Sequence, residues 1–305
     1  MQSLVKKSVL SVELVRNFEK FVDVTPATMK AYKTGIRAFL RYVAENGVKS
    51  PTTETVLNFK RSLLNAGRKP STINLYLSAT KRFFNWTAKA GLYPDISNGV
   101  KGVKTDKGFK KDFLIGSQLK EILGGFNTAT LEGMRNYAIF ALMSTCGLRT
   151  CEISRAKISD LSTLAGQPVL YIHGKNRTDA KDFVKLSKPV ENALKSYLKM
   201  RDKATKADAL FASCSDRNFG QSISRVTVST MCKKAMVKAG YDSDRLTAHS
   251  LRHSAITLAL MGGESLQNVQ AFARHSSIAI TTIYAHNVTR INSQCENLIS
   301  KEIFN

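Results

Sequence analysis

The chain has 305 residues, of which 43% are hydrophobic, and this length favours two domains over one. Its 46 Lys and Arg against 23 Asp and Glu give a formal charge of +23 and an isoelectric point near 9.9. Residues 1–104 hold 18 basic and 6 acidic side chains, and the remainder hold 28 and 17. This imbalance suits a nucleic-acid binder better than an ordinary metabolic enzyme, so we expect both halves to contact DNA.

Cysteines and apolar runs limit the compartment. Five cysteines without a C-x-x-C pair argue against a disulfide framework or structural zinc, and we expect reduced thiols, no metal and no cofactor. Lys6, Lys7 and Glu13 interrupt the N-terminal apolar runs, which does not fit a signal peptide, and no run is long enough to span a bilayer. We expect a cytoplasmic, nucleoid-associated protein that works on chromosomal or plasmid DNA and has no membrane partner.

Residues 1–104 are predicted to form an all-helical domain. Apolar residues at helical spacing predict helices at 11–22, 28–45, 52–65 and 70 to about 90, two of which follow Thr25-Pro26 and Pro70-Ser71. In the second helix Lys33, Arg37 and Arg41 recur at four-residue spacing, and this basic face is a candidate DNA contact. The aromatic residues of the fourth helix have core spacing rather than base-stacking spacing: Tyr76, Phe83, Phe84 and Trp86.

Glycines and lysines dominate residues 99–112, and we assign 105–112 to a basic linker between the domains. In the second domain, 113–305, helices are predicted at 117–123, 131–144, 189–201 and 226–239. Three β-like runs are predicted at 156–161, 169–173 and 183–186, the last two as a hairpin around 174–182. The predicted fold class is mainly α, with an all-helical N-terminal domain and a mainly helical second domain that holds a small antiparallel β-sheet.

The stretch 246–286 carries the most chemistry. His249 and Arg252 share one face at the head of a predicted helix, and Thr247 is its expected N-cap, so this helix start favours an anion. A second amphipathic run ends near Arg274, and His275 and Tyr284 follow. Basic groups beside a tyrosine, without a carboxylate pair or a metal cluster, indicate attack of a phenol on a phosphodiester.

These residues resemble a known family. His-x-x-Arg, then His, then Tyr nine positions later resembles the second signature box of the tyrosine recombinases (phage integrase, Xer-like). Residues 147–153, GLRTCEI, resemble the first box, and residues 172–176, IHGKN, resemble the turn that carries the family's active lysine. All of these motifs occur in the family's order, over a region from about residue 114 to the end of the chain. The resemblance implies site-specific cleavage and rejoining of DNA through a 3′-phosphotyrosine, on a double-stranded recombination site, by a homotetramer.

The resemblance also implies a role for each motif residue. Tyr284 would be the nucleophile, and Arg149 and Arg252 would neutralise the phosphate, for which planar, permanently charged guanidiniums are suited. His249 would be the general base or a proton shuttle, and His275 would donate a hydrogen bond to the phosphate. Lys175, or Lys181 if the turn is shifted, would be the general acid, and Glu152 would orient a residue of the first box. No role is assigned to three further histidines, His173, His253 and His286, and His253 is expected to face the core or to pack the helix.

Two features of the chain leave alternatives open. The family commonly has Leu-Gly-His where this chain has Ala273-Arg274-His275; either the helix ends differently, or Arg274 adds a phosphate contact. A left-handed arginine there would cost roughly 1 kcal/mol. The tail 287–305 is expected to form a helix that either packs on its own domain or is donated to a neighbouring protomer.

The motifs also leave open the biological role, which could be integration or excision of a mobile genetic element, or dimer resolution. Two competing functions are a type IB topoisomerase with the same chemistry and a non-catalytic DNA-binding protein with the same fold.

Overall fold

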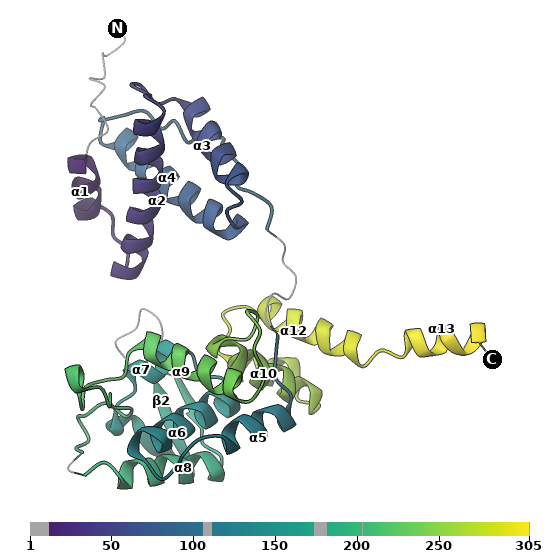
Figure 1. The fold of residues 1–305 in the computed structure, drawn as a ribbon. Helices are drawn as coiled ribbons and strands as arrows, with labels where there is room; N and C mark the ends of the chain where they lie inside the picture. The colour runs from purple at the N-terminus through teal and green to yellow at the C-terminus, as the bar shows by residue number, and fades with distance from the viewer. Residues whose placement is uncertain (1–11, 106–111, 174–181, 203, 305) are drawn as a thin grey trace. The chain divides into compact units, whose positions relative to one another are not determined.

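The computed structural model describes residues 12–105, 112–173, 182–202 and 204–304 (Figure 1). The chain divides into two units, Met1–Gly108 and Phe109–Asn305. This division falls within the stretch rich in glycine and lysine, but most of the proposed linker lies outside the described residues, so its bounds stay a prediction. The mainly helical class with one small antiparallel sheet is confirmed.

The described part of the first unit is helical. Its elements are α1 (Val12–Phe21), α2 (Pro26–Glu45), α3 (Thr53–Asn65) and α4 (Pro70–Lys89). The Thr25 hydroxyl accepts a hydrogen bond from the Thr28 backbone N–H, and Pro26 occupies the first turn of α2, where its missing N–H costs nothing. The predicted start of this helix at Thr25-Pro26 is therefore confirmed.

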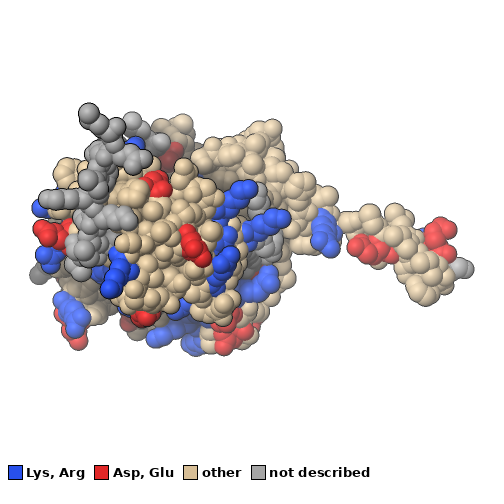
Figure 2. Space-filling model, turned by 90° about the horizontal axis from the view of Figure 1, so that it is seen from above, with Lys and Arg blue, Asp and Glu red and all other residues tan. Residues whose placement is uncertain are grey.

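Helices α2 and α4 pack side by side in the first unit (Figure 1). A Cβ on Gly35 would lie 2.8 Å from the Ala79 Cβ, so only glycine permits this close approach. Phe83 and Phe84 are buried, which confirms their prediction as core residues. Of the proposed DNA contacts on α2, Arg37 and Arg41 are exposed, whereas the Lys33 ammonium forms an ion pair with Glu19. In the face of the molecule shown in Figure 2, basic and acidic side chains are interspersed.

The second unit holds nine α-helices and three strands among its described residues. The helices are α5 (Gly116–Gly124), α6 (Leu131–Cys146), α7 (Thr150–Arg155), α8 (Lys188–Lys199), α9 (Arg225–Lys238), α10 (Ala248–Met261), α11 (Leu266–Ala273), α12 (Ile278–Ile291) and α13 (Cys295–Phe304). Two short 3-10 helices, η1 and η2, are Ile158–Asp160 and Asp216–Asn218.

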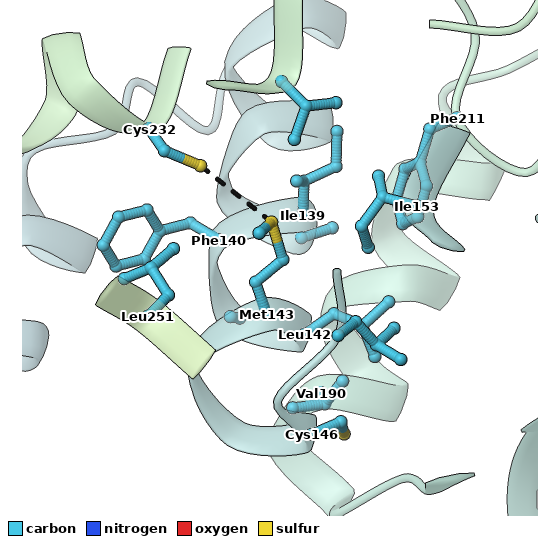
Figure 3. Packing of buried hydrophobic residues seen from close by; sticks show 14 of the residues in the cluster. Ile139, Phe140, Leu142, Met143, Cys146, Ile153, Val190, Phe211, Cys232 and Leu251 are labelled. Carbon is cyan, nitrogen blue, oxygen red and sulfur yellow. Dashed lines mark hydrogen bonds between the residues drawn. The ribbon is translucent and has the colours of Figure 1, made fainter. Parts of the chain in front are cut away.

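Helix α6 lies at the centre of the core of this unit. Nearly all its residues from Ala138 onward are buried, and α5, α8, α9 and α10 pack around it. The close-up in Figure 3 shows the Cys232 thiol directed at the Met143 sulfur, 4.0 Å away, with Phe140 and Leu251 beside them. Burial raises the pKa of the Cys232 thiol to about 12, so this thiol stays protonated and serves as a core residue.

The sheet has the order β1-β2-β3, with all neighbours antiparallel: β1 (Leu161–Leu164), β2 (Gln167–Ile172) and β3 (Asp182–Lys185). Ile172 pairs with Asp182, so β2 and β3 flank the predicted turn, as expected. The prediction of a strand at 156–161 is wrong. Within that run the Asp160 carboxylate accepts a hydrogen bond from the Lys157 backbone N–H at 2.7 Å, which closes η1, and β1 begins only at Leu161.

The predicted single helix over 287–305 is also wrong, because α12 continues to Ile291 and a break precedes α13. No described residue of α13 is buried, and in Figure 1 the helix lies beyond the end of α12. Leu298, Ile299, Ile303 and Phe304 are between 58% and 81% exposed. Within the described residues, α13 therefore does not pack on its own unit.

No helix in the described part of the chain combines the length and apolar character needed to cross a bilayer. The same residues contain no group of three or more His, Cys, Asp or Glu arranged to hold a metal ion.

Candidate active site

Arg252 is a buried residue of the second signature box, and its side chain contacts the first box. It lies on α10, whose start is fixed by a 3.0 Å hydrogen bond from the Thr247 backbone N–H to the Ser250 hydroxyl, and the predicted N-cap at Thr247 is confirmed. The Arg252 side chain is buried; Nη1 donates to the Gly147 carbonyl at 2.6 Å and Nη2 donates to the Ala273 carbonyl. Burial, with help from Arg149 and Arg274, lowers its pKa to about 10, which leaves it charged at neutral pH.

Gly147 shapes the first box by ending α6 in the left-handed conformation, with φ of +61°. A Cβ there would meet the Phe272 ring at 3.4 Å, so the position suits glycine in both backbone angle and space. The turn places Arg149 at the N-cap of α7. Its side chain is 36% exposed, which leaves it accessible to a ligand.

Glu152 binds two arginines. Its carboxylate accepts hydrogen bonds from the backbone N–H and Nη1 of Arg149, both at 2.8 Å, and from Nη2 of Arg274 at 2.9 Å. The Glu152 side chain is only 2% exposed. A buried carboxylate needs such partners, and here it fixes the position of Arg149. Glu152 is thus placed where the sequence predicted an orienting group.

For Arg274 the structure excludes a different helix end, and the phosphate contact stays a prediction. It ends α11 in the left-handed conformation, with φ of +53°, so the helix stops where a glycine would stop it. Its guanidinium turns inward, is 8% exposed, and donates Nη1 to the Phe272 carbonyl at 3.1 Å. Nε is buried and has no hydrogen-bond partner among the described residues.

His275 is held as a neutral ring. Nδ1 lies 2.9 Å from the Thr281 hydroxyl. Burial first, and then the charges of Arg252, Arg149 and Arg274, lower the pKa of His275 to about 4. A neutral imidazole carries one N–H; if Nδ1 accepts the Thr281 proton, Nε2 is the donor.

Tyr284 lies in the middle of α12 and is 6% exposed. Its ring stacks against His275 with centroids 6.0 Å apart, and its hydroxyl lies 2.5 Å from Nδ1 of His253. Burial raises the pKa of the Tyr284 phenol, while Arg252 and Arg149 oppose that rise. The phenol is therefore close enough to both guanidiniums for their charge to act on it.

An open cleft of about 830 Å³ borders the site on the side of Arg149, Arg274 and His275. Its lining residues are Arg149, Glu152, Asp182, Gln267, Gln270, Ala271, Arg274, His275, Ser276 and Ile280.

The predicted site residues differ in where they lie. The structure brings Arg149, Glu152, Arg252, Arg274, His275 and Tyr284 together, and His249 acts electrostatically on His275. Lys175 and its alternative Lys181 lie outside the described residues. Lys33, Arg37 and Arg41 belong to the other unit.

One residue of the site was missed by sequence reasoning. His253 was expected to face the core or to pack the helix and was given no role, but it contacts the Tyr284 hydroxyl and packs edge to face against His249, with ring centroids 4.6 Å apart. The signal was available in part, because His253 follows His249 by four residues and so lies on the same face of α10. The bond to Tyr284 depends on how α10 and α12 pack, which spacing does not give.

Cations, the neutral His275 and a phenol at one site beside an open cleft suit the transfer of a phosphodiester to a tyrosine. Comparison with known proteins agrees. The phage integrase family model matches residues 112–290, and the phage integrase N-terminal SAM-like domain matches residues 22–91. A tyrosine recombinase of Synechococcus elongatus is 28% identical over 292 residues, covering 91% of this chain and 90% of that protein. Tyrosine recombinase XerD of Proteus mirabilis is 29% identical over 287 residues, covering 89% and 88%.

Solved structures share the fold. XerH site-specific recombinase bound to palindromic difH substrate superposes with a TM-score of 0.74 at 20% identity, over 94% of this chain and 83% of that one. A lambda integrase(75–356) dimer bound to a COC′ core site gives 0.67 at 16% identity, over 88% and 96%. The chain belongs to the phage integrase family. It is a site-specific tyrosine recombinase, a DNA breaking and rejoining enzyme with a tyrosine nucleophile.

Proposed function

We propose that Tyr284 is the nucleophile of this recombinase and that the scissile phosphate binds in the cleft between Arg149 and His275. The observation that carries the proposal is the convergence of Arg149, Arg252, His275 and Tyr284, from four separate segments, on one site. The Tyr284 oxygen bonds to phosphorus, the bond from phosphorus to the 5′ oxygen breaks, and the DNA 3′ end stays attached to the protein. The phosphotyrosine keeps the energy of the broken bond, so rejoining needs no nucleotide.

The cations stabilise the charge that builds on the equatorial oxygens during attack. Arg252 is held in advance by two backbone carbonyls, and Arg149 by Glu152, so neither has to be reorganised when DNA arrives. The neutral His275, with its other ring nitrogen engaged by Thr281, would donate Nε2–H to a phosphate oxygen.

Proton transfer completes the proposed reaction. We assign protonation of the leaving 5′ oxygen to Lys175, with Lys181 as the alternative, and we place His249 within the proton path from the phenol.

Arg274 is proposed to support the phosphate site rather than only to end a helix. It shares the Glu152 carboxylate with Arg149, so it limits the positions that Arg149 can take. It also adds a second positive charge, besides that of Arg149, to the lining of the cleft. This chain would thus use an arginine where other family members use a glycine.

A double-stranded DNA site and further copies of the chain are the proposed partners. Arg37 and Arg41 in the first unit are exposed and available to phosphates. The exposed apolar residues of α13 are proposed to dock on a neighbouring copy, as part of a tetramer on two DNA sites, in the nucleoid. A Leu298→Glu, Ile303→Glu double variant should bind one site normally but fail to assemble pairs of sites in sedimentation of the DNA complex. Val226→Glu, at a 74% exposed position of α9, is the control; unchanged assembly of the double variant would refute the docking role.

Tyr284→Phe tests the nucleophile. The full-length protein is incubated with nicked suicide substrates made from the genomic flanks of its gene, and covalent adducts are separated on denaturing gels. The variant should bind DNA as the wild type does and form no adduct, because only the attacking oxygen is removed. Tyr241→Phe is the matched control, since the Tyr241 hydroxyl bonds Glu121 away from the cleft. Adducts that persist in Tyr284→Phe would show that another residue attacks.

A further inference from the structure

His253 is placed to do more than pack α10. Its Nδ1 lies 2.5 Å from the Tyr284 hydroxyl, and the two ring centroids are 5.2 Å apart at an interplanar angle of 31°. A phenol oxygen carries one proton, and the Nδ1 of a neutral histidine accepts it when the other ring nitrogen bears the hydrogen. The contact therefore joins the proposed attacking oxygen directly to a group that can take up its proton.

We propose that His253 is the general base that accepts the Tyr284 proton as the phenol attacks phosphorus. This inference rests on the proposed role of Tyr284 as the nucleophile. The proton moves from the Tyr284 oxygen to Nδ1, the oxygen bonds to phosphorus, and the 5′ oxygen leaves with a proton from the general acid. In rejoining, the imidazolium returns its proton to the departing phenolate. No oxidant, metal or nucleotide enters the balance.

The other two histidines of the site are less suited to this step. His275 stacks on the Tyr284 ring, its Nδ1 is engaged by Thr281, and its low pKa makes it a poor proton acceptor. His249 contacts the His253 ring edge to face, from one helical turn away. This contact places His249 to orient His253 or to pass its proton on.

Surrounding charge sets when the transfer occurs. Guanidiniums near the phenol favour the phenolate but disfavour a second positive charge on an imidazole. A bound phosphate brings negative charge into the same space, and so the imidazolium becomes tolerable when substrate is present. Among the described residues, His253 contacts His249 on α10 and Tyr284 on α12. The charges of Arg252 and Arg149 act on Tyr284, and those of Arg252, Arg149 and Arg274 act on His275, which stacks on the same tyrosine.

His253→Asn is the informative variant, because an amide oxygen near the Nδ1 position can still accept the hydroxyl hydrogen bond but cannot take up its proton. We expect DNA affinity and thermal unfolding close to those of the wild type. Single-turnover cleavage of the suicide substrate should be about 100-fold to 10,000-fold slower at pH 7. The wild-type rate should fall as the pH is lowered through the range where histidine titrates, and this acid limb should vanish in the variant. His286→Asn, at an exposed position of α12, is the control.

A second substrate separates the base from the acid. With sulfur in place of the bridging 5′ oxygen, the leaving group needs no proton. This substrate should restore cleavage to a Lys175→Ala variant but not to His253→Asn. The assignment of His253 as the base would be overturned if His253→Asn cleaved at the wild-type rate, kept the acid limb of the pH profile, or was rescued by the sulfur substrate. Loss of the acid limb in His249→Asn alone would show that His249 is the base. Absence of any adduct with the wild-type protein would instead count against the proposed function.

Discussion

Replacing Arg274 by glycine separates two things that this residue does. Glycine removes a left-handed strain of about 1 kcal/mol, but the more flexible unfolded chain takes back about 0.5–1 kcal/mol, so the backbone effects nearly cancel. The charge-assisted hydrogen bond from Arg274 to Glu152, at 2.9 Å and 8% exposure, contributes about 1.5–3 kcal/mol. Glu152 keeps its bonds to Arg149 and is not left unpaired. Arg274→Gly should therefore lower the free energy of unfolding by about 1–3 kcal/mol.

The cleavage assay tells whether Arg274 also supports catalysis. Without Arg274, the Glu152 carboxylate binds Arg149 alone, and the Arg149 side chain can take more positions. Single-turnover cleavage should therefore slow by roughly 10-fold to 100-fold. Arg274→Gln keeps the left-handed strain and loses the charge, and it should slow cleavage similarly. Ala165→Gly, at the other described non-glycine residue of positive φ, relieves strain in the β1–β2 turn and should leave cleavage unchanged. An Arg274→Gly protein that is more stable than the wild type and cleaves at its rate would refute this reasoning.

Two further predictions concern the charge of the site. Arg149→Ala should reduce cleavage by about 1000-fold and DNA affinity only modestly, because it removes a preorganised donor to the developing charge; equal losses in gel-shift and cleavage assays would make Arg149 a docking residue. His275 has a folded pKa of about 4, below the ordinary 6.5, so the unfolded chain binds its proton first as pH falls. Its contribution to stability is present above pH 6.5 and is lost as the pH falls toward 4. Urea unfolding of His275→Gln should show a flatter decline over that window, and a decline equal to that of the wild type would contradict the assigned environment.

The site was predictable where it depends on local spacing. His249 and Arg252 are three residues apart on one helix, and Arg149 and Glu152 are three apart across the start of another, so sequence alone places each pair together. The αL turn at Gly147 is likewise local.

Contacts between distant segments were not predictable in this way. Arg252 bonds carbonyls of Gly147 and Ala273, 105 and 21 residues away, and His253 meets Tyr284 across 31 residues. These pairings depend on how α10 packs against its neighbours, which helical periodicity does not specify.

The two errors in secondary structure have local physical causes. Apolar residues in 156–161 suggested a strand, but the Asp160 carboxylate captures the Lys157 backbone N–H and closes a tight turn instead. Near the C-terminus, the apolar pattern runs on from α12 into α13, while residues 292–294 break the helix between them. The apolar periodicity used for the prediction does not detect the turn at Asp160 or the break at residues 292–294.

The positive charge near the cleft destabilises the DNA-free protein only slightly, because carbonyl and carboxylate groups already partly neutralise it. Arg252 is surrounded by carbonyl dipoles, and Glu152 takes up the charges of Arg149 and Arg274 together. These partners are fixed by the ends of α6 and α11, so the same turns that end the helices set the positions of the cations. An arginine has five N–H groups, and the two backbone bonds of Arg252 use only two of them. A phosphate can therefore be bound without breaking the contacts that hold the site together, which is the condition for electrostatic catalysis without reorganisation.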